Sequence, residues 1–314
     1  MVWPFHRSSK ARPSNATQPL PLDAAAIVRR ARRLRFLVRP EAVSQLAGAY
    51  HGARPGIGLI FAELRPYEPG DDVRHVDWNV TARQGKPYVR RYVEERALVL
   101  WIVVDVSASM RFGPEGKTKA DRAAQAAALL ATAAVQNGDR VGLLLVSDRL
   151  EAEIVPGIGI RHLSQLVRGL VATPTCSTKT QLDVALTRIR RSGRRSLIVA
   201  ISDFDGEQAI GAWRQAARRN EVVALRLVDP REEVLPEAGL IRLESAEQGE
   251  RRTVDTRSKR VRANYARVAE GRRAAFTRWC AATGVDGFTI STAHDPISPL
   301  IELFSNRAKR RGGP

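Results

Sequence analysis

The sequence predicts an α/β protein, with a doubly wound and mostly parallel sheet preceded by an N-terminal strand-rich subdomain. From residue 97 onward, short uninterrupted apolar runs alternate with longer segments of helical periodicity. Such runs are typical of strands that helices cover on both faces, which is the arrangement of a parallel sheet. The chain has 314 residues, 44% of them apolar, which is enough to bury a large core.

Composition also indicates where in the cell the protein is expected. No apolar stretch approaches the ~18 to 20 residues that cross a bilayer, and residues 1–22 lack the apolar core of a signal peptide. The two cysteines, Cys176 and Cys280, are too few for a disulfide framework and have no metal-ligand spacing. We therefore expect a soluble, cytoplasmic protein.

The chain begins with a leader and continues into the subdomain, residues 23–96. Residues 1–22 mix Ser, Pro, Asn and Arg without periodicity, which predicts a flexible basic leader. Asp23 can cap a short basic helix over residues 24–36, because its carboxylate can accept the first amide N–H groups of the helix. A second helical piece is expected over residues 42–49.

The rest of the subdomain has the character of strands and turns. Pro and Gly within residues 68–72 predict a turn, and residues 88–93 alternate in polarity as a strand does. Three acids and one histidine follow the turn closely: Asp71, Asp72, His75 and Asp77. This cluster can bind a cation, but turn capping is the simpler interpretation. Trp78 and Tyr88 are expected to anchor a core.

Residues 97–308 form the predicted α/β domain, and residues 309–314 a basic tail. The expected strands are residues 97–106, 141–146, 196–201, 222–228 and 288–291. The expected helices are residues 120–137, 181–191, 207–219, 262–283 and a last one near 299–306. An apolar stripe at helical spacing supports the second helix: Leu182, Ala185, Leu186 and Ile189. A small hairpin is expected from residues 240–243 and 253–255.

The formal net charge is +18, and it is unevenly distributed. Residues 1–40 hold nine Lys and Arg against Asp23 alone. Within the α/β domain there is one dense basic cluster: Arg188, Arg190, Arg191, Arg194 and Arg195. An acidic protein, a membrane surface or loosely bound nucleic acid would each suit these charges, and so would charged faces that contact only solvent.

Oxygen-bearing side chains gather where the predicted strands end. Asp105, Ser107 and Ser109 follow the first strand, Thr180 precedes a helix, and Asp203 follows the strand over 196–201. In a doubly wound sheet the carboxyl ends of the strands meet at one edge. Carboxylate and hydroxyl oxygens are ligands for hard cations, so the residues predict a site for Mg²⁺, or for Mn²⁺ or Ca²⁺. Asp203 can act directly or through water, which leaves one position open.

These five residues resemble the metal-ion-dependent adhesion site of von Willebrand factor A domains. The last loop departs from that pattern, because it reads Ser202-Asp203-Phe204 where these domains usually read Thr-Asp-Gly. Upstream, residues 65–78 and 82–90 resemble the signature of the bacterial domain of unknown function 58 family. The two resemblances together cover about residues 45–308.

The resemblance implies a von Willebrand factor A-like fold and a non-catalytic adaptor role. In such a role, an acidic side chain of a protein partner fills the open metal position. Family members are typically encoded beside MoxR-type AAA+ ATPases, which implies a partner of that kind in protein maturation or complex remodelling. Many relatives carry two membrane helices, whereas this chain shows none.

Three other functions are alternatives to the adaptor role. Residues 113–118 sit between a strand and a helix as a phosphate-binding loop would, but Arg111 stands where such a loop needs glycine. A metal-dependent phosphohydrolase could use Asp105, yet position 107 is Ser and offers no acid–base group, so we expect no enzyme. A nucleic-acid binder acting through the basic termini remains the third alternative.

Overall fold

The computed structural model describes residues 40–52, 59–69, 71–72, 76–94, 98–114, 116–172, 177, 179–193, 195–206, 208–244 and 251–311. The predicted leader, the helix expected over 24–36 and the last three residues of the tail lie outside these ranges. Residues 309–311 of the predicted tail belong to the last helix of the protein.

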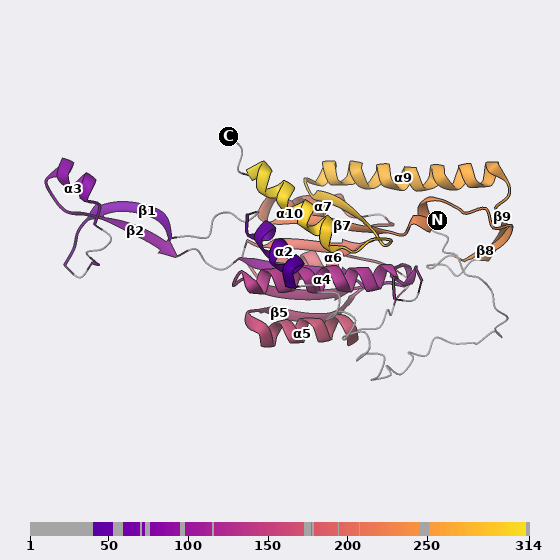
Figure 1. Cartoon of the computed structure of the whole chain (residues 1–314), viewed down its shortest axis with the longest axis horizontal. Coiled ribbons are helices and arrows are strands. Elements are labelled where there is room, and N and C mark those ends of the chain that lie inside the picture. The colour runs from indigo at the N-terminus through magenta and orange to yellow at the C-terminus, as the bar shows by residue number, and fades with distance from the viewer. Residues whose placement is uncertain are drawn as a thin grey trace.

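A six-stranded sheet forms the centre of the protein (Figure 1). Its strands lie side by side in the order β10 (Asp286–Ser291), β7 (Glu221–Val228), β6 (Leu197–Ser202), β3 (Val99–Asp105), β4 (Arg140–Val146) and β5 (Leu150–Gly157). All neighbours are parallel except β4 and β5. The chain therefore starts in the middle of the sheet and builds outward in both directions, as in doubly wound folds. The predicted fold class is confirmed.

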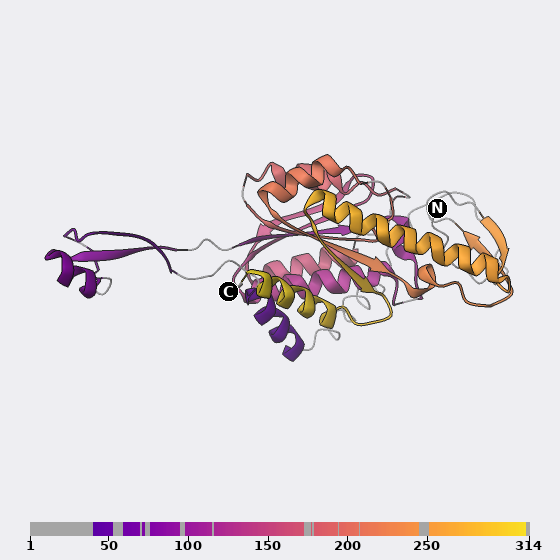
Figure 2. The same ribbon diagram turned by 90° about the horizontal axis from the view of Figure 1, so that it is seen from above.

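Helices cover both faces of the sheet (Figure 2). One face carries α2 (Pro40–Gly52), α4 (Lys119–Gln136), α5 (Gly159–Ala172) and α10 (Ile297–Arg311). The other carries α6 (Asp183–Arg190), α7 (Ile210–Arg219) and α9 (Lys259–Thr283). Successive residues of a strand point to opposite faces, so Leu100 and Ile102 of β3 pack in the first layer, whereas Trp101 and Val103 pack in the second.

Two elements of the domain, β5 and α5, are not among those that the sequence predicts. β5 is the antiparallel edge strand and most of it is only half-buried, so it lacks the continuous apolar run of the central strands. In α5 the buried Leu163, Leu166 and Leu170 recur at helical spacing, a signal that could have revealed the helix.

The N-terminal strands form a separate hairpin. β1 (Leu59–Pro66) pairs with β2 (Tyr88–Glu94), and α3 (Trp78–Gln84) lies between them in the chain. Asp77 caps α3 by accepting the N–H groups of Asn79 and Val80, which agrees with the capping interpretation. Trp78 is 65% exposed, so its expected core role is wrong. The reason is that the hairpin extends away from the sheet (Figure 1).

The remaining elements are short. They are η2 (Ala108–Arg111), α8 (Pro230–Glu233) and the expected hairpin of β8 (Leu240–Glu244) and β9 (Arg251–Asp255). Within the described ranges, no helix is long and apolar enough to span a bilayer.

Candidate metal centre

The oxygen-bearing loops meet at the carboxyl edge of the sheet. Asp105 is the last residue of β3, and Ser202 is the last residue of the neighbouring β6. The amide N–H of Ala108 donates to the carbonyl oxygen of Ser177 over 2.8 Å, which ties the loop after β3 to the segment that leads to Thr180. Tertiary structure thus brings together segments about 75 and 100 residues apart.

Asp105 is buried, and its carboxylate accepts hydrogen bonds from three residues. One carboxylate oxygen accepts the N–H of Ser107 at 2.8 Å. The other accepts the hydroxyl of Ser202 at 2.6 Å and that of Thr180 at 3.3 Å. Hydroxyl groups from the end of β6 and from the segment before α6 therefore orient this carboxylate.

Asp203 lies on the far side of the two serines. The hydroxyl oxygens of Ser107 and Ser109 are 3.2 Å apart, and Ser109 also hydrogen-bonds to the Asp203 carboxylate. One Asp203 oxygen accepts the N–H of Asp205, and the other accepts a 2.8 Å hydrogen bond from the ammonium of Lys119. The structure therefore brings together all five predicted residues, which we call the candidate metal centre: Asp105, Ser107, Ser109, Thr180 and Asp203.

The two carboxylates have opposite electrostatic environments. Burial, together with the negative charge of Asp203, raises the pKa of Asp105 from 3.8 to about 6. Burial alone would also raise the pKa of Asp203, but the charge and hydrogen bond of Lys119, together with the hydrogen bonds from Ser109 and the Asp205 N–H, outweigh that effect and lower it. Asp203 thus has a cation of the protein's own beside it, whereas Asp105 forms no ion pair with any residue that the structure describes.

The donor set fits a small, hard divalent cation. It consists only of carboxylate and hydroxyl oxygens, and hydroxyl hydrogens can rotate away from a metal. Asp105, Ser107, Ser109 and Thr180 can supply direct ligands. Asp203 already pairs with the Lys119 ammonium, so its contribution through water is the better fit. That such an ion binds stays a prediction.

Lys119 and Ser202 hydrogen-bond to the candidate metal centre and are not among the site residues that the sequence predicts. Lys119 begins α4 and is fully buried, and its ammonium also donates to Glu232 of α8 at 2.8 Å. Its position directly after the Thr118 helix cap, with Asp121 completing a capping box, is visible in the sequence. Its partners are not, because they lie 84 and 113 residues away.

Phe204 explains the departure from the usual third loop. Its backbone has φ of +51°, a conformation that glycine adopts easily and other residues rarely do. Its ring contacts three others: Trp213, Phe276 and Trp279, with centroids 5.3 to 6.1 Å away. Phe204 therefore keeps the loop geometry of glycine and adds an aromatic anchor.

Known proteins resemble this chain in sequence over most of its length. The model of the family described as "Protein of unknown function DUF58" matches residues 63–275. The uncharacterized proteins Rv1480 of Mycobacterium tuberculosis and Mb1516 of Mycobacterium bovis are both 33% identical to it over 295 residues, which are 93% of this chain and 92% of theirs.

Resemblance to solved structures is more distant. BatB from Bacteroides thetaiotaomicron is 16% identical with a TM-score of 0.44, covering 68% of this chain and all of that one. Proximal thread matrix protein 1 from the mussel byssus, solved with a zinc-occupied MIDAS motif, is 12% identical with a TM-score of 0.40 and covers 68% of this chain and 48% of that one.

Proposed function

The chain belongs to the DUF58 family of proteins of unknown function, and from this premise we propose that it is a non-catalytic adaptor that holds a protein partner through a divalent cation. The observation that carries the proposal is the convergence of five oxygen-bearing side chains at the carboxyl edge of the sheet. Mg²⁺ is the ion we propose first, with Mn²⁺ and Ca²⁺ as alternatives.

In this proposal the cation connects the two proteins. Asp105, Ser107, Ser109 and Thr180 hold it directly, and Asp203 holds it through water. Mg²⁺ prefers six oxygen ligands, so the protein leaves room for one from outside. A carboxylate of the partner fills that position, and its charge is then balanced by the cation. We propose a MoxR-type AAA+ ATPase in the cytoplasm as the partner, acting in protein maturation or complex remodelling.

A binding role accounts for the site better than hydrolysis does. A metal-dependent hydrolase needs a group that can exchange a proton near the ion. Lys119 lies near, but its two carboxylate partners raise its pKa even though burial opposes this, so it stays an ammonium ion. Position 107 carries a hydroxyl group where an acid–base carboxylate would be needed.

Metal binding is tested first on the purified protein. Titration calorimetry with Mg²⁺ and Mn²⁺ should show one site in the wild type, and Asp105→Ala should abolish it. Glu302→Ala removes an exposed carboxylate of α10 and serves as the control that keeps the site. Circular dichroism should show that both variants are folded.

Partner binding is tested by affinity capture from a lysate of the source cells. The immobilised wild type should retain an AAA+ ATPase in Mg²⁺ and release it in EDTA, and Asp105→Ala should retain none. Capture that is unchanged in EDTA and in Asp105→Ala would reject the proposal.

A further inference from the structure

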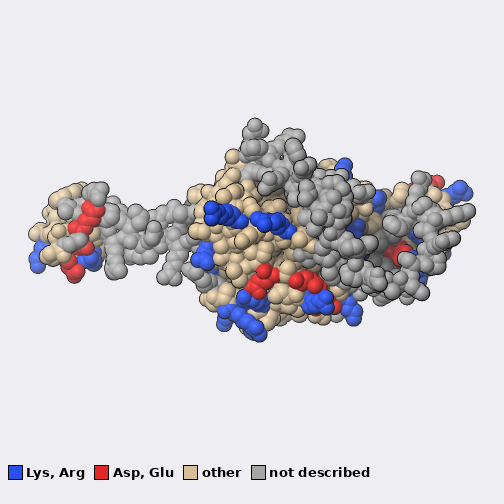
Figure 3. Space-filling view, turned by 90° about the horizontal axis from the view of Figure 1, so that it is seen from below, with Lys and Arg blue, Asp and Glu red and all other residues tan. Residues whose placement is uncertain are grey.

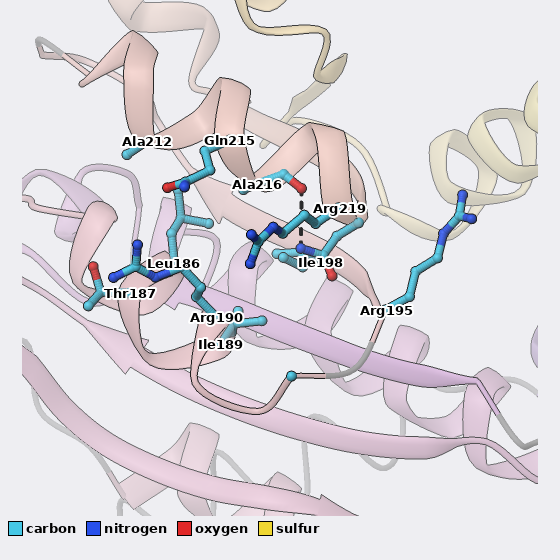
Figure 4. A pocket seen from close by; sticks show the side chains of 12 residues that line it. Leu186, Thr187, Ile189, Arg190, Arg195, Ile198, Ala212, Gln215, Ala216 and Arg219 are labelled. Carbon is cyan, nitrogen blue, oxygen red and sulfur yellow. Dashed lines mark hydrogen bonds between the residues drawn. The ribbon is translucent and has the colours of Figure 1, made fainter.

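A pocket of about 440 Å³ lies at the edge of the sheet opposite the candidate metal centre. It opens between α6 and α7, and Ile198 at the beginning of β6 lies at its floor (Figure 4). Strand β6 runs from this pocket to Ser202 beside the candidate metal centre. At about 3.3 Å per residue, Ile198 and Ser202 lie roughly 13 Å apart along the strand.

The lining of the pocket combines an apolar floor with a basic rim. The floor is built from five apolar side chains: Leu186, Ile189, Ile198, Ala212 and Ala216. The rim carries three exposed arginines, namely Arg190, Arg195 and Arg219. None of the twelve described residues that line it is acidic. We call this site the arginine pocket.

The arginines of the rim make no ion pair with any residue that the structure describes. Arg188, only two residues from Arg190, does pair with a carboxylate, that of Glu153 at 2.6 Å. In Figure 4 the side chains of Arg190 and Arg219 reach over the same side of the pocket, while Arg195 extends away on the other side. The rim thus presents guanidinium groups to solvent above an apolar surface.

Helix electrostatics explain part of this arrangement. Arg190 and Arg219 lie in the last turns of α6 and α7, where a positive charge is favourable beside the unpaired carbonyl groups. That role needs only a positive charge at each helix end. Helix electrostatics does not require the ends of α6 and α7 to border the same apolar pocket. The shared pocket is therefore the feature that indicates a ligand.

We propose that the arginine pocket binds an acidic peptide segment of a protein partner, with an apolar side chain between its carboxylates. Arginine binds carboxylates through two parallel hydrogen bonds, and the apolar floor can take a leucine-sized side chain. Exposed Arg191 and Arg218 adjoin the rim residues in sequence and extend the positive charge beyond the cavity. A positively charged surface larger than the pocket suits an acidic peptide better than a small anion.

The test uses a fluorescein-labelled peptide, Asp-Leu-Glu-Glu-Leu-Asp, and fluorescence anisotropy with the full-length protein. The double variant Arg190→Gln/Arg219→Gln should bind it at least about tenfold more weakly than the wild type. The matched control, Arg161→Gln/Arg278→Gln, removes two exposed arginines from α5 and α9 and should bind normally. Equal affinity in the two double variants would overturn the proposal.

Two altered peptides separate the parts of the ligand. A peptide with Asn and Gln in place of the acids should not bind, because the guanidinium groups lose their partners. A peptide with Ser in place of the leucines should bind several-fold more weakly. If the serine peptide binds as tightly as the original, the attraction is a general charge effect and the pocket has no role.

Two further experiments test for a small-anion ligand and for dependence on the candidate metal centre. Displacement of the peptide by equimolar pyrophosphate would identify a small-anion site and overturn the peptide assignment; no displacement supports it. Peptide binding should be unchanged in EDTA and in Asp105→Ala, so this inference can hold even if the proposed metal-dependent function fails. A loss of peptide binding in Asp105→Ala would overturn the claim that the arginine pocket is separate from the candidate metal centre.

Discussion

At Phe204, a strained backbone and a well-packed side chain occur in one residue. The positive φ opposes folding, whereas the contacts with Trp213, Phe276 and Trp279 favour it. The loop that carries Asp203 is therefore held in place by aromatic packing beneath it. This is the reason that a bulky residue is tolerated at a position that suits glycine.

Substitution of Phe204 separates the two effects. We expect Phe204→Ala to lower the free energy of unfolding by about 3 to 5 kcal/mol, because it leaves a cavity in the aromatic cluster. Phe204→Gly leaves the same cavity but relieves the backbone, so it should be more stable than Phe204→Ala by roughly 1 kcal/mol. Urea unfolding measures both, and an alanine variant more stable than the glycine variant would contradict this.

Cys280 is a thiol whose environment suppresses its reactivity. Burial, together with the negative charge of Asp286, raises the pKa of the Cys280 thiol from 9.0 to about 11. Below that pH the reactive thiolate is scarce, and burial also limits access to the sulfur.

We expect Cys280 to react slowly with iodoacetamide near neutral pH. In a Cys176→Ser variant, where it is the only thiol, the rate should still rise about tenfold per pH unit between pH 8 and 10. The same variant in guanidinium chloride should level off near pH 9, because the unfolded thiol has an ordinary pKa. If the alkylation rate of the native protein has its pH midpoint near 9, the pKa of Cys280 is not raised by the fold.

At the scale of elements, a buried ammonium ion connects three parts of the fold. Lys119 begins α4, Asp203 follows β6, and Glu232 lies in α8, and both Lys119 hydrogen bonds measure 2.8 Å. All three side chains are buried, so each charge depends on the others for compensation. Lys119 therefore ties the loop that carries Asp203 to two helices, namely α4 and α8.

Removal of this ammonium should be costly. We expect Lys119→Met to destabilise the protein by about 3 to 5 kcal/mol in urea unfolding, because two buried carboxylates lose their cation. Adding Glu232→Gln should recover part of that loss, since one uncompensated charge disappears. Lys117→Met, an exposed neighbour, should change stability by less than about 0.5 kcal/mol. Equal stability of Lys119→Met and Lys117→Met would contradict the proposed connection.

The elements differ in how well the sequence predicts them. β3, β4 and β6 are almost entirely apolar because helices cover both of their faces, and β7 is apolar apart from Glu221 at its start and the buried Arg226. Each of the four was predicted to within a few residues. β5 lies at an edge and has no such run. The other edge strand, β10 (Asp286–Ser291), is also only partly buried, and the sequence predicts it over residues 288–291 alone. Apolar runs therefore predict the central strands well and the edge strands in part or not at all.

At the scale of the whole molecule, the sheet separates two surfaces of different chemistry. Its carboxyl edge carries the buried acidic and hydroxyl groups of the candidate metal centre, and its opposite edge carries the arginine pocket. On the face drawn in Figure 3, basic side chains stand in small groups among uncharged and acidic ones.

The sequence by itself determined the fold class, the central strands and the five residues of the candidate metal centre, since each leaves a local pattern of apolar runs or of oxygen-bearing residues at strand ends. Only the tertiary structure decided the partners of Lys119, the hydrogen bond of Ser202 to Asp105, and the arginine pocket. These features depend on contacts between segments far apart in the chain, and local periodicity carries no information about such contacts. Phe204 belongs to both: the sequence marked it as a departure, and the packing explained it.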